Sequence, residues 1–144
     1  MSKDFVYTGP TLAVDAVCIT PEGNLILIER LNEPYGFALP GGIAEKGETT
    51  EEGVIREVYE EIGCKFTITG LHGVYSRPDR DPRGHTVSIV YVGWTGDTPV
   101  ASSDAKAIKI VTVEEALKLP MAFDHSQILK DVFDVSQQWE DCRW

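Results

Sequence analysis

Three glutamates, Glu57, Glu60 and Glu61, are spaced so that one helix would carry their carboxylates on a single face. Residues three or four apart are neighbours on a helix surface, so like charges at this spacing repel each other. A hard divalent cation such as Mg²⁺ or Mn²⁺ would relieve that repulsion, because it prefers carboxylate oxygens and completes its shell with water and substrate phosphates. The spacing predicts a metal site for a phosphorylated substrate; the alternative is a solvated acidic face.

The helix that carries these glutamates has start and stop signals of its own. Thr49 or Thr50 can cap its first turn, with Glu52 placed to complete a capping box, and Gly63 is suited to end it. At about 100° per residue, one arc of this helix is apolar and can pack on a core. The residues of that arc are Val54, Ile55, Val58 and Ile62.

A glycine-rich loop precedes the helix, and Gly41 and Gly42 would let the backbone approach a ligand closely. Residues 42–64, GIAEKGETTEEGVIREVYEEIGC, fit the pattern Gx5Ex7REUxEExGU of the Nudix box at every specified position. The chain therefore resembles the Nudix hydrolases. The resemblance implies an α/β fold, the Nudix-type α/β/α sandwich with a mixed β-sheet, and hydrolysis of a pyrophosphate bond in a nucleoside diphosphate derivative.

The same resemblance implies a divalent metal cofactor, Mg²⁺ or else Mn²⁺, and assigns roles by position. Glu57 and Glu61 would be the principal metal ligands, and the carbonyl of Gly41 would add another oxygen. Glu60 would be a further ligand or would orient the attacking water. Bound metal neutralises the diphosphate and lowers the pKa of its water. Asp104, in a later loop, is an alternative general base.

A second segment with chemical potential is SRPDRDPRGHTVS, residues 76–88, which is basic in an acidic chain. Guanidinium groups match phosphate oxygens, so we expect this segment to hold the end of the substrate away from the metal. The alternative is a solvated loop whose arginines pair with Asp79 and Asp81. The segment resembles the ADP-ribose pyrophosphatase branch of the family, in which a proline follows the box at about the place of Pro78. Its candidate substrate contacts are Arg77, Arg80, Arg83 and His85.

The nucleoside end of a substrate needs a flat side chain on which a base can stack. Tyr35 is the main candidate, beside Tyr7 and Phe37, although core packing is the better interpretation of Phe37. Arg30, which ends a predicted strand, is a further candidate for a phosphate, or else forms a surface ion pair. The string AFDH at residues 122–125 also resembles the ADP-ribose pyrophosphatase branch.

Alternating and β-branched stretches predict strands on both sides of the box helix. Asp15 interrupts the first strand, and a structural role is the better interpretation of this lone carboxylate. The expected strands are 11–20, 24–29, 66–71, 73–76, 85–94 and 108–112, with further helices at 113–119 and 123–139. A third, short strand is expected just before the glycine loop.

Length and charge bound the remaining possibilities. The 144 residues suit one domain, 1–144, and the net charge of −10 argues against nucleic acid as a partner. Three cysteines without CxxC spacing predict neither zinc nor disulfides. The chain lacks a signal-peptide pattern and a run of about 18 apolar residues, so we expect a cytoplasmic protein away from the membrane. An apolar terminal helix would permit a homodimer.

These observations together predict metal-dependent hydrolysis of ADP-ribose, or a related ADP-sugar, to AMP and ribose 5-phosphate. The box places metals without selecting the rest of the substrate. Dinucleoside polyphosphates, NADH and damaged nucleoside triphosphates therefore remain alternative substrates. A non-catalytic ADP-ribose-binding module is the alternative from another class of protein.

Overall fold

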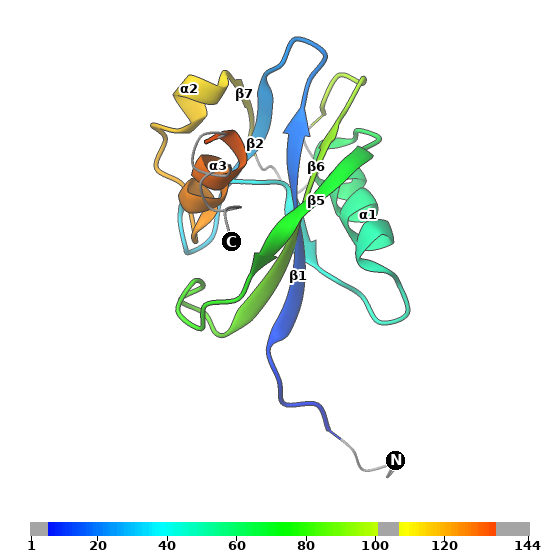
Figure 1. The fold of residues 1–144 in the computed structure, drawn as a ribbon, viewed down its shortest axis with the longest axis vertical. Coiled ribbons are helices and arrows are strands. Elements are labelled where there is room, and N and C mark those ends of the chain that lie inside the picture. The colour runs from blue at the N-terminus through cyan, green and yellow to red at the C-terminus, as the bar shows by residue number, and fades with distance from the viewer. Residues whose placement is uncertain (1–5, 101–106, 135–144) are drawn as a thin grey trace, which may run out of the picture.

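The computed structural model describes residues 6–100 and 107–134, which form a seven-stranded mixed sheet with helices on both faces (Figure 1). The predicted α/β/α sandwich is confirmed. The strands are β1 (Thr11–Ile19), β2 (Leu25–Arg30), β3 (Gly36–Ala38), β4 (Gly41–Ile43), β5 (Thr67–Tyr75), β6 (Thr86–Trp94) and β7 (Ala107–Val111). The helices are α1 (Thr50–Ile62), α2 (Val113–Ala116) and α3 (His125–Phe133). No helix among the described residues is long and apolar enough to cross a membrane.

Strand β1 is the centre of the sheet. It runs parallel to β6 from Thr11↔Thr86 to Ile19↔Trp94, and antiparallel to β2 and β4. The predicted hairpin between β1 and β2 is confirmed, with Ile19 opposite Leu25. Strands β3 and β7 pair with β2, and β5 pairs with β6 at the edge of the sheet. Strand β4, which carries Gly41 and Gly42, therefore lies directly beside β1.

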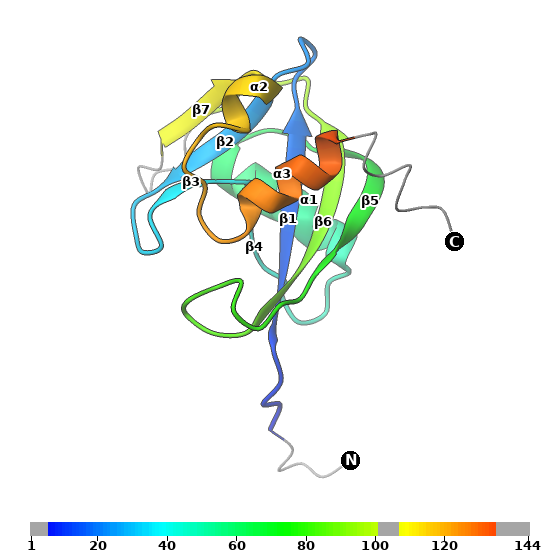
Figure 2. The same ribbon diagram turned by 60° about the vertical axis from the view of Figure 1, so that its left-hand side comes forward.

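The alternation of side chains along β1 builds two hydrophobic layers, one on each face of the sheet. Val14, Ala16 and Cys18 pack against α1, whereas Val17 belongs to the layer beneath α2 and α3. Figure 2 shows α3 passing over the face that carries β1 and β6. Asp15 lies two residues before Val17 and therefore faces the same side of the sheet. Its buried carboxylate is on the side that α3 covers.

The structure confirms most of what the sequence predicts for helix α1. The side chain of Thr49 accepts from the backbone of Glu52 in a complete capping box, and Gly63 ends the helix with a left-handed φ of 68°. The apolar arc is narrower than expected, because Ile55 is 39% exposed. The helix packs instead through Val54, Val58 and Ile62, which are fully buried. Burying each such aliphatic side chain stabilises the fold by about 1.5–3 kcal/mol.

Three further elements differ from the sequence prediction. The expected third strand is two short strands, β3 and β4, separated by Leu39 and Pro40. The expected strands at 66–71 and 73–76 are one strand, β5, because register shifts at Ile68/Gly70 and Leu71/Gly73 absorb the irregularity. Helix α3 begins at His125 rather than Phe123, and the predicted extension to 139 lies largely outside the described residues.

Candidate active site

Arg56 lies at the centre of the acidic face of α1. Its guanidinium donates to both carboxylate oxygens of Glu48, at 2.8 and 3.0 Å, to Glu57 at 2.9 Å and to Glu60 at 3.1 Å. The hydrogen bonds from Arg56 and from the Glu45 backbone lower the pKa of Glu48 to about 2. The repulsion predicted for this face is therefore offset in part by a cation within the same segment.

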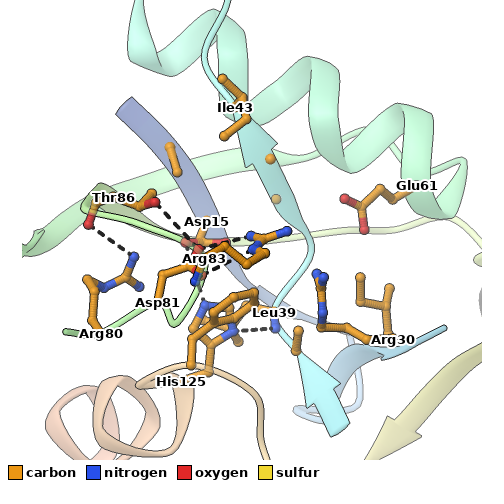
Figure 3. Close-up of a pocket in the computed structure, with 16 residues that line it drawn as sticks. Asp15, Arg30, Leu39, Ile43, Glu61, Arg80, Asp81, Arg83, Thr86 and His125 are labelled. Carbon is orange, nitrogen blue, oxygen red and sulfur yellow. Dashed lines mark hydrogen bonds and ion pairs between the residues drawn. The ribbon is translucent and has the colours of Figure 1, made fainter. Parts of the chain in front are cut away.

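Glu61 is buried on the core side of α1. It is 7% exposed and lines a pocket together with Gly41 and Gly42. Figure 3 shows its carboxylate reaching from α1 into the same space as the guanidinium of Arg30. We call Gly41, Gly42 and Glu61 the box side of the pocket.

The two glycines of the box side have no room for a side chain. A Cβ at Gly41 would collide with the carbonyl oxygen of Val14 and the carboxylate of Asp15. A Cβ at Gly42 would collide with the carboxylate of Glu57. At Gly41 the close backbone, rather than a positive φ, explains why glycine is required. At Gly42 a side chain would displace the end of the Glu57 side chain.

The donor set on this side suits a hard divalent cation, although no group of three or more His, Cys, Asp or Glu side chains in the described ranges forms a ready-made metal cluster. The carboxylate of Glu57 lies against Gly42, and Glu61 shares the pocket with Gly41. Carboxylate and carbonyl oxygens are the ligands that Mg²⁺ prefers, with substrate phosphates and water completing the shell. Glu60, whose side chain is 55% exposed, does not line the pocket.

Facing the box side is a cluster of two arginines and an aromatic ring, which we call the arginine side: Arg30, Arg83 and Phe123. The guanidinium carbons of Arg30 and Arg83 lie 4.8 and 5.2 Å from the centroid of the Phe123 ring. Phe123 has a left-handed φ of 57°, an uncommon conformation for a non-glycine residue. Burial and the nearby charge of Arg83 lower the pKa of Arg30, while the carboxylates of Asp81 and Glu61 act in the opposite direction. The two guanidinium groups therefore meet beside carboxylates, and Asp81 pairs with Arg83 at 2.9 Å.

The basic segment at residues 76–88 includes the connection between the antiparallel strands β5 and β6, and we call it the basic hairpin. Its other predicted contacts are placed differently. Arg80 lines the pocket but is buried, and it forms a bidentate pair with Asp124, with hydrogen bonds of 2.6 and 2.9 Å. Arg77 is exposed and pairs with Asp79 at 3.2 Å. His85 lines an adjoining cavity, where its Nε2 lies 3.0 Å from the carbonyl oxygen of Ser76. Arg83 also pairs within the loop, because its guanidinium donates to both carboxylate oxygens of Asp81, at 2.9 and 3.1 Å. The alternative of intraloop ion pairs is therefore confirmed for Arg77 with Asp79 and for Arg83 with Asp81.

Two predicted residues fall elsewhere. Tyr35 is 66% exposed and lines neither cavity. Tyr7 is also exposed, and its hydroxyl donates to the carbonyl oxygen of Pro10 at 3.2 Å. Asp104 lies outside the described residues.

Sequence reasoning did not predict that three further polar residues line the pocket. Asp15, Asp81 and His125 are buried there, from β1, the basic hairpin and α3. Burial raises the pKa of Asp15, but His125, Ser88 and Arg80 lower it by more, so the pKa lies below its ordinary value of 3.8. The AFDH string and the carboxylate inside β1 were the available signals, and neither indicated that the two would meet.

A model of the NUDIX domain matches residues 9–132 of the chain. Over 134 residues, the chain is 45% identical to an ADP-ribose pyrophosphatase of Methanocaldococcus jannaschii, covering 91% of this chain and 78% of that protein. It also resembles the crystal structure of a bifunctional NMN adenylyltransferase/ADP ribose pyrophosphatase from Francisella tularensis, complexed with AMP and a manganese ion. That match has a TM-score of 0.71 and 28% identity, and covers 94% of this chain and 43% of the other.

A further similar structure is the NUDIX domain of Shewanella oneidensis NrtR, complexed with ADP ribose. Its TM-score is 0.81 at 22% identity, over 93% of this chain and 98% of that one, which shows the shared fold. The complete box, the pocket beside it and the family match over residues 9–132 lead to one conclusion: the chain is a member of the Nudix hydrolase family.

Proposed function

We propose that this protein hydrolyses the pyrophosphate bond of ADP-ribose, or of a related ADP-sugar, to AMP and ribose 5-phosphate, using Mg²⁺ or else Mn²⁺. The observation that carries the proposal is the pocket itself, in which Glu61 of the box side faces Arg30 and Arg83 of the arginine side. Such a site combines oxygen donors for a metal with cations for a diphosphate. The name of the relative from Methanocaldococcus jannaschii supports the choice of substrate.

On the box side, Glu57, Glu61 and the Gly41 carbonyl would hold the metal, with Glu60 as a further ligand or as the residue that orients water. When bound, such an ion neutralises the diphosphate and lowers the pKa of water. Glu61 combines burial with a place on the pocket wall, so its carboxylate is held in one position before the substrate arrives. Asp104 is the alternative general base.

On the arginine side, Arg30 and Arg83 would bind the phosphate oxygens. Before the substrate arrives, Arg83 is held by its two hydrogen bonds to Asp81, and Arg30 by its hydrogen bond to the Pro34 carbonyl at 2.7 Å. The Phe123 ring lies against both guanidinium groups and adds a cation–π contact. Arg83 also lines the adjoining cavity with His85, so a substrate extending from the pocket would reach that residue. Arg80 would act indirectly, through its pair with Asp124.

A substrate panel tests this proposal. Purified protein with Mg²⁺ is incubated with ADP-ribose, ADP-glucose, a diadenosine polyphosphate, NADH and a nucleoside triphosphate, and the products are separated by ion-exchange chromatography. We expect ADP-ribose to give AMP and ribose 5-phosphate with the highest kcat/KM, and EDTA to abolish turnover. If a nucleoside triphosphate were hydrolysed as fast as ADP-ribose, the assignment of the substrate would be wrong.

Calorimetry with ADP-ribose separates the enzyme from a binding module. Tight binding without metal-dependent turnover would indicate a non-catalytic ADP-ribose-binding protein.

The acidic net charge of −10 supports a small nucleotide rather than nucleic acid as the ligand. A homodimer stays a prediction that light scattering can check.

A further inference from the structure

The AFDH segment, residues 122–125, joins α3 to the strands that carry the pocket. The backbone N–H of Ala122 donates to the carbonyl of Phe37 at 2.7 Å, which fastens the segment to β3. Asp124 pairs with Arg80 of the basic hairpin. His125 is the first residue of α3, and it is only 2% exposed. Each ring nitrogen of His125 has a contact with another residue.

The first contact defines the tautomer of His125. The backbone N–H of Leu39 donates to Nδ1 at 3.0 Å (Figure 3). Nδ1 must therefore present a lone pair, which leaves the ring proton on Nε2. Nε2 lies 3.7 Å from a carboxylate oxygen of Asp15, and the hydroxyl of Ser88 donates to the same oxygen.

Both contacts lead to the backbone of Gly41. Leu39 comes two residues before Gly41, and the carbonyl of the intervening Pro40 accepts from the N–H of Ala16 at 2.8 Å. Asp15 pairs with Gly41 in the sheet, and its carboxylate fills the space that a Cβ of Gly41 would need. His125 thus reaches Gly41 along the chain through Leu39 and across the sheet through Asp15.

We propose that His125 is a positioning residue for the divalent cation, because its Nδ1 fixes the Leu39–Gly41 segment and with it the Gly41 carbonyl. This inference rests on the proposed function, in which that carbonyl is a metal ligand. His125 itself touches neither metal nor substrate in this role. Groups that orient metal ligands typically change metal affinity by about 10–100-fold when they are removed.

Two conservative variants separate the two ring nitrogens. In His125→Asn, the side-chain oxygen can take the place of Nδ1 and keep the acceptor for Leu39. In His125→Gln, the amide can take the place of Nε2 and keep the donor toward Asp15, but the acceptor for Leu39 is lost. Gln127→Ala, on the same helix and outside the pocket, is the matched control for a general disturbance of α3.

Metal binding is measured directly, by electron paramagnetic resonance of free Mn²⁺ with and without ADP-ribose. We expect His125→Gln to weaken Mn²⁺ binding by about 10-fold and to raise the half-saturating Mg²⁺ concentration for turnover by a similar factor. His125→Asn should remain within about 3-fold of wild type, and kcat at saturating metal should change less than the metal requirement. Equal metal affinity in wild type and folded His125→Gln would overturn the inference.

A second measurement does not depend on the variants folding. Long-range ¹H–¹⁵N NMR of the wild-type protein reports which ring nitrogen of His125 carries the proton. A protonated Nε2 with an unprotonated Nδ1 supports the inference, and a proton on Nδ1 overturns it whatever the enzyme hydrolyses. Wild-type protein that bound no Mn²⁺ even with ADP-ribose would overturn the proposed function together with the inference, whereas normal wild-type binding with an unaffected His125→Gln would overturn the inference alone.

Discussion

The two sides of the pocket are assembled in opposite ways. The box side comes from one continuous stretch, in which β4 supplies the glycines and the next element, α1, supplies Glu61. The arginine side draws Arg30 from β2, Arg83 from the basic hairpin and Phe123 from the segment just before α3. The first side is a local motif and the second depends on the whole fold. This contrast explains how one box can serve many substrates.

The polar contacts that support each side differ in the same manner. Arg56 holds Glu48 from eight residues away and Glu60 from one helical turn away. On the other side, Arg80 and Asp124 are 44 residues apart. Damage to a local contact should lower the stability of the fold only a little, whereas damage to a long-range contact should lower it more.

The largest effect should come from the box side. Glu61→Gln removes a negative charge from the pocket, and we expect turnover of ADP-ribose to fall by at least about 100-fold, the scale of a lost electrostatic contact in a preorganised site. AMP release is followed by chromatography, and thermal unfolding confirms that the variant folds. Glu114→Gln, in the first turn of α2, is the control. Retention of more than a tenth of wild-type turnover would contradict the role of Glu61.

The long-range pair should matter chiefly for stability. Arg80→Met leaves the partly buried Asp124 without its bidentate partner. We therefore expect the free energy of unfolding to fall by about 2 kcal/mol, less than the ~3–5 kcal/mol typical of fully buried pairs. Urea unfolding followed by circular dichroism measures it. The double variant Arg80→Met/Asp124→Leu should recover part of the loss, since both charges are then removed. A single variant as stable as wild type would show that the pair does not hold the hairpin to α3.

The arginine side should act mainly on substrate binding. Arg83→Gln removes a cation from the pocket, and we expect KM for ADP-ribose to rise by about 10-fold, as for the loss of a charge-assisted hydrogen bond. Arg77→Gln removes a cation from the same hairpin outside the pocket, so its KM should stay near that of wild type. Steady-state kinetics at fixed Mg²⁺ compare the two. Equal effects would mean that the hairpin acts through its overall charge.

The smallest effect should be a change in acid stability on the box side. Because the folded pKa of Glu48 is about 2, below its ordinary value of 4.5, the ionised carboxylate stabilises the fold. That stabilisation is complete above about pH 4.5 and is lost as the pH falls toward 2. Glu48→Gln should therefore be less stable than wild type at pH 7, and the two should converge near pH 2 in urea titrations. A difference independent of pH would exclude Glu48 as its source.

Local features of the fold were predictable because their causes are local. The Thr49 cap, the Gly63 stop and the buried Val58 all follow from spacing along one helix. Ile55 was misplaced because its arc position is compatible with the core, and only the packing of α1 against the sheet decides how wide the buried stripe is. The prediction divided β5 at His72, whereas pairing with β6 carries the strand through two irregularities.

The sequence by itself determined the box: its glycines, its capped helix and the order of its carboxylates, because each depends on neighbours within a few turns. It also contained the basic hairpin and AFDH as separate signals. Only the tertiary structure decided that Arg83 meets Phe123, that Arg80 turns to Asp124 and that His125 reaches Leu39. These contacts join residues tens of positions apart, and the parallel pairing of β1 with β6 and the packing of α3 bring them together.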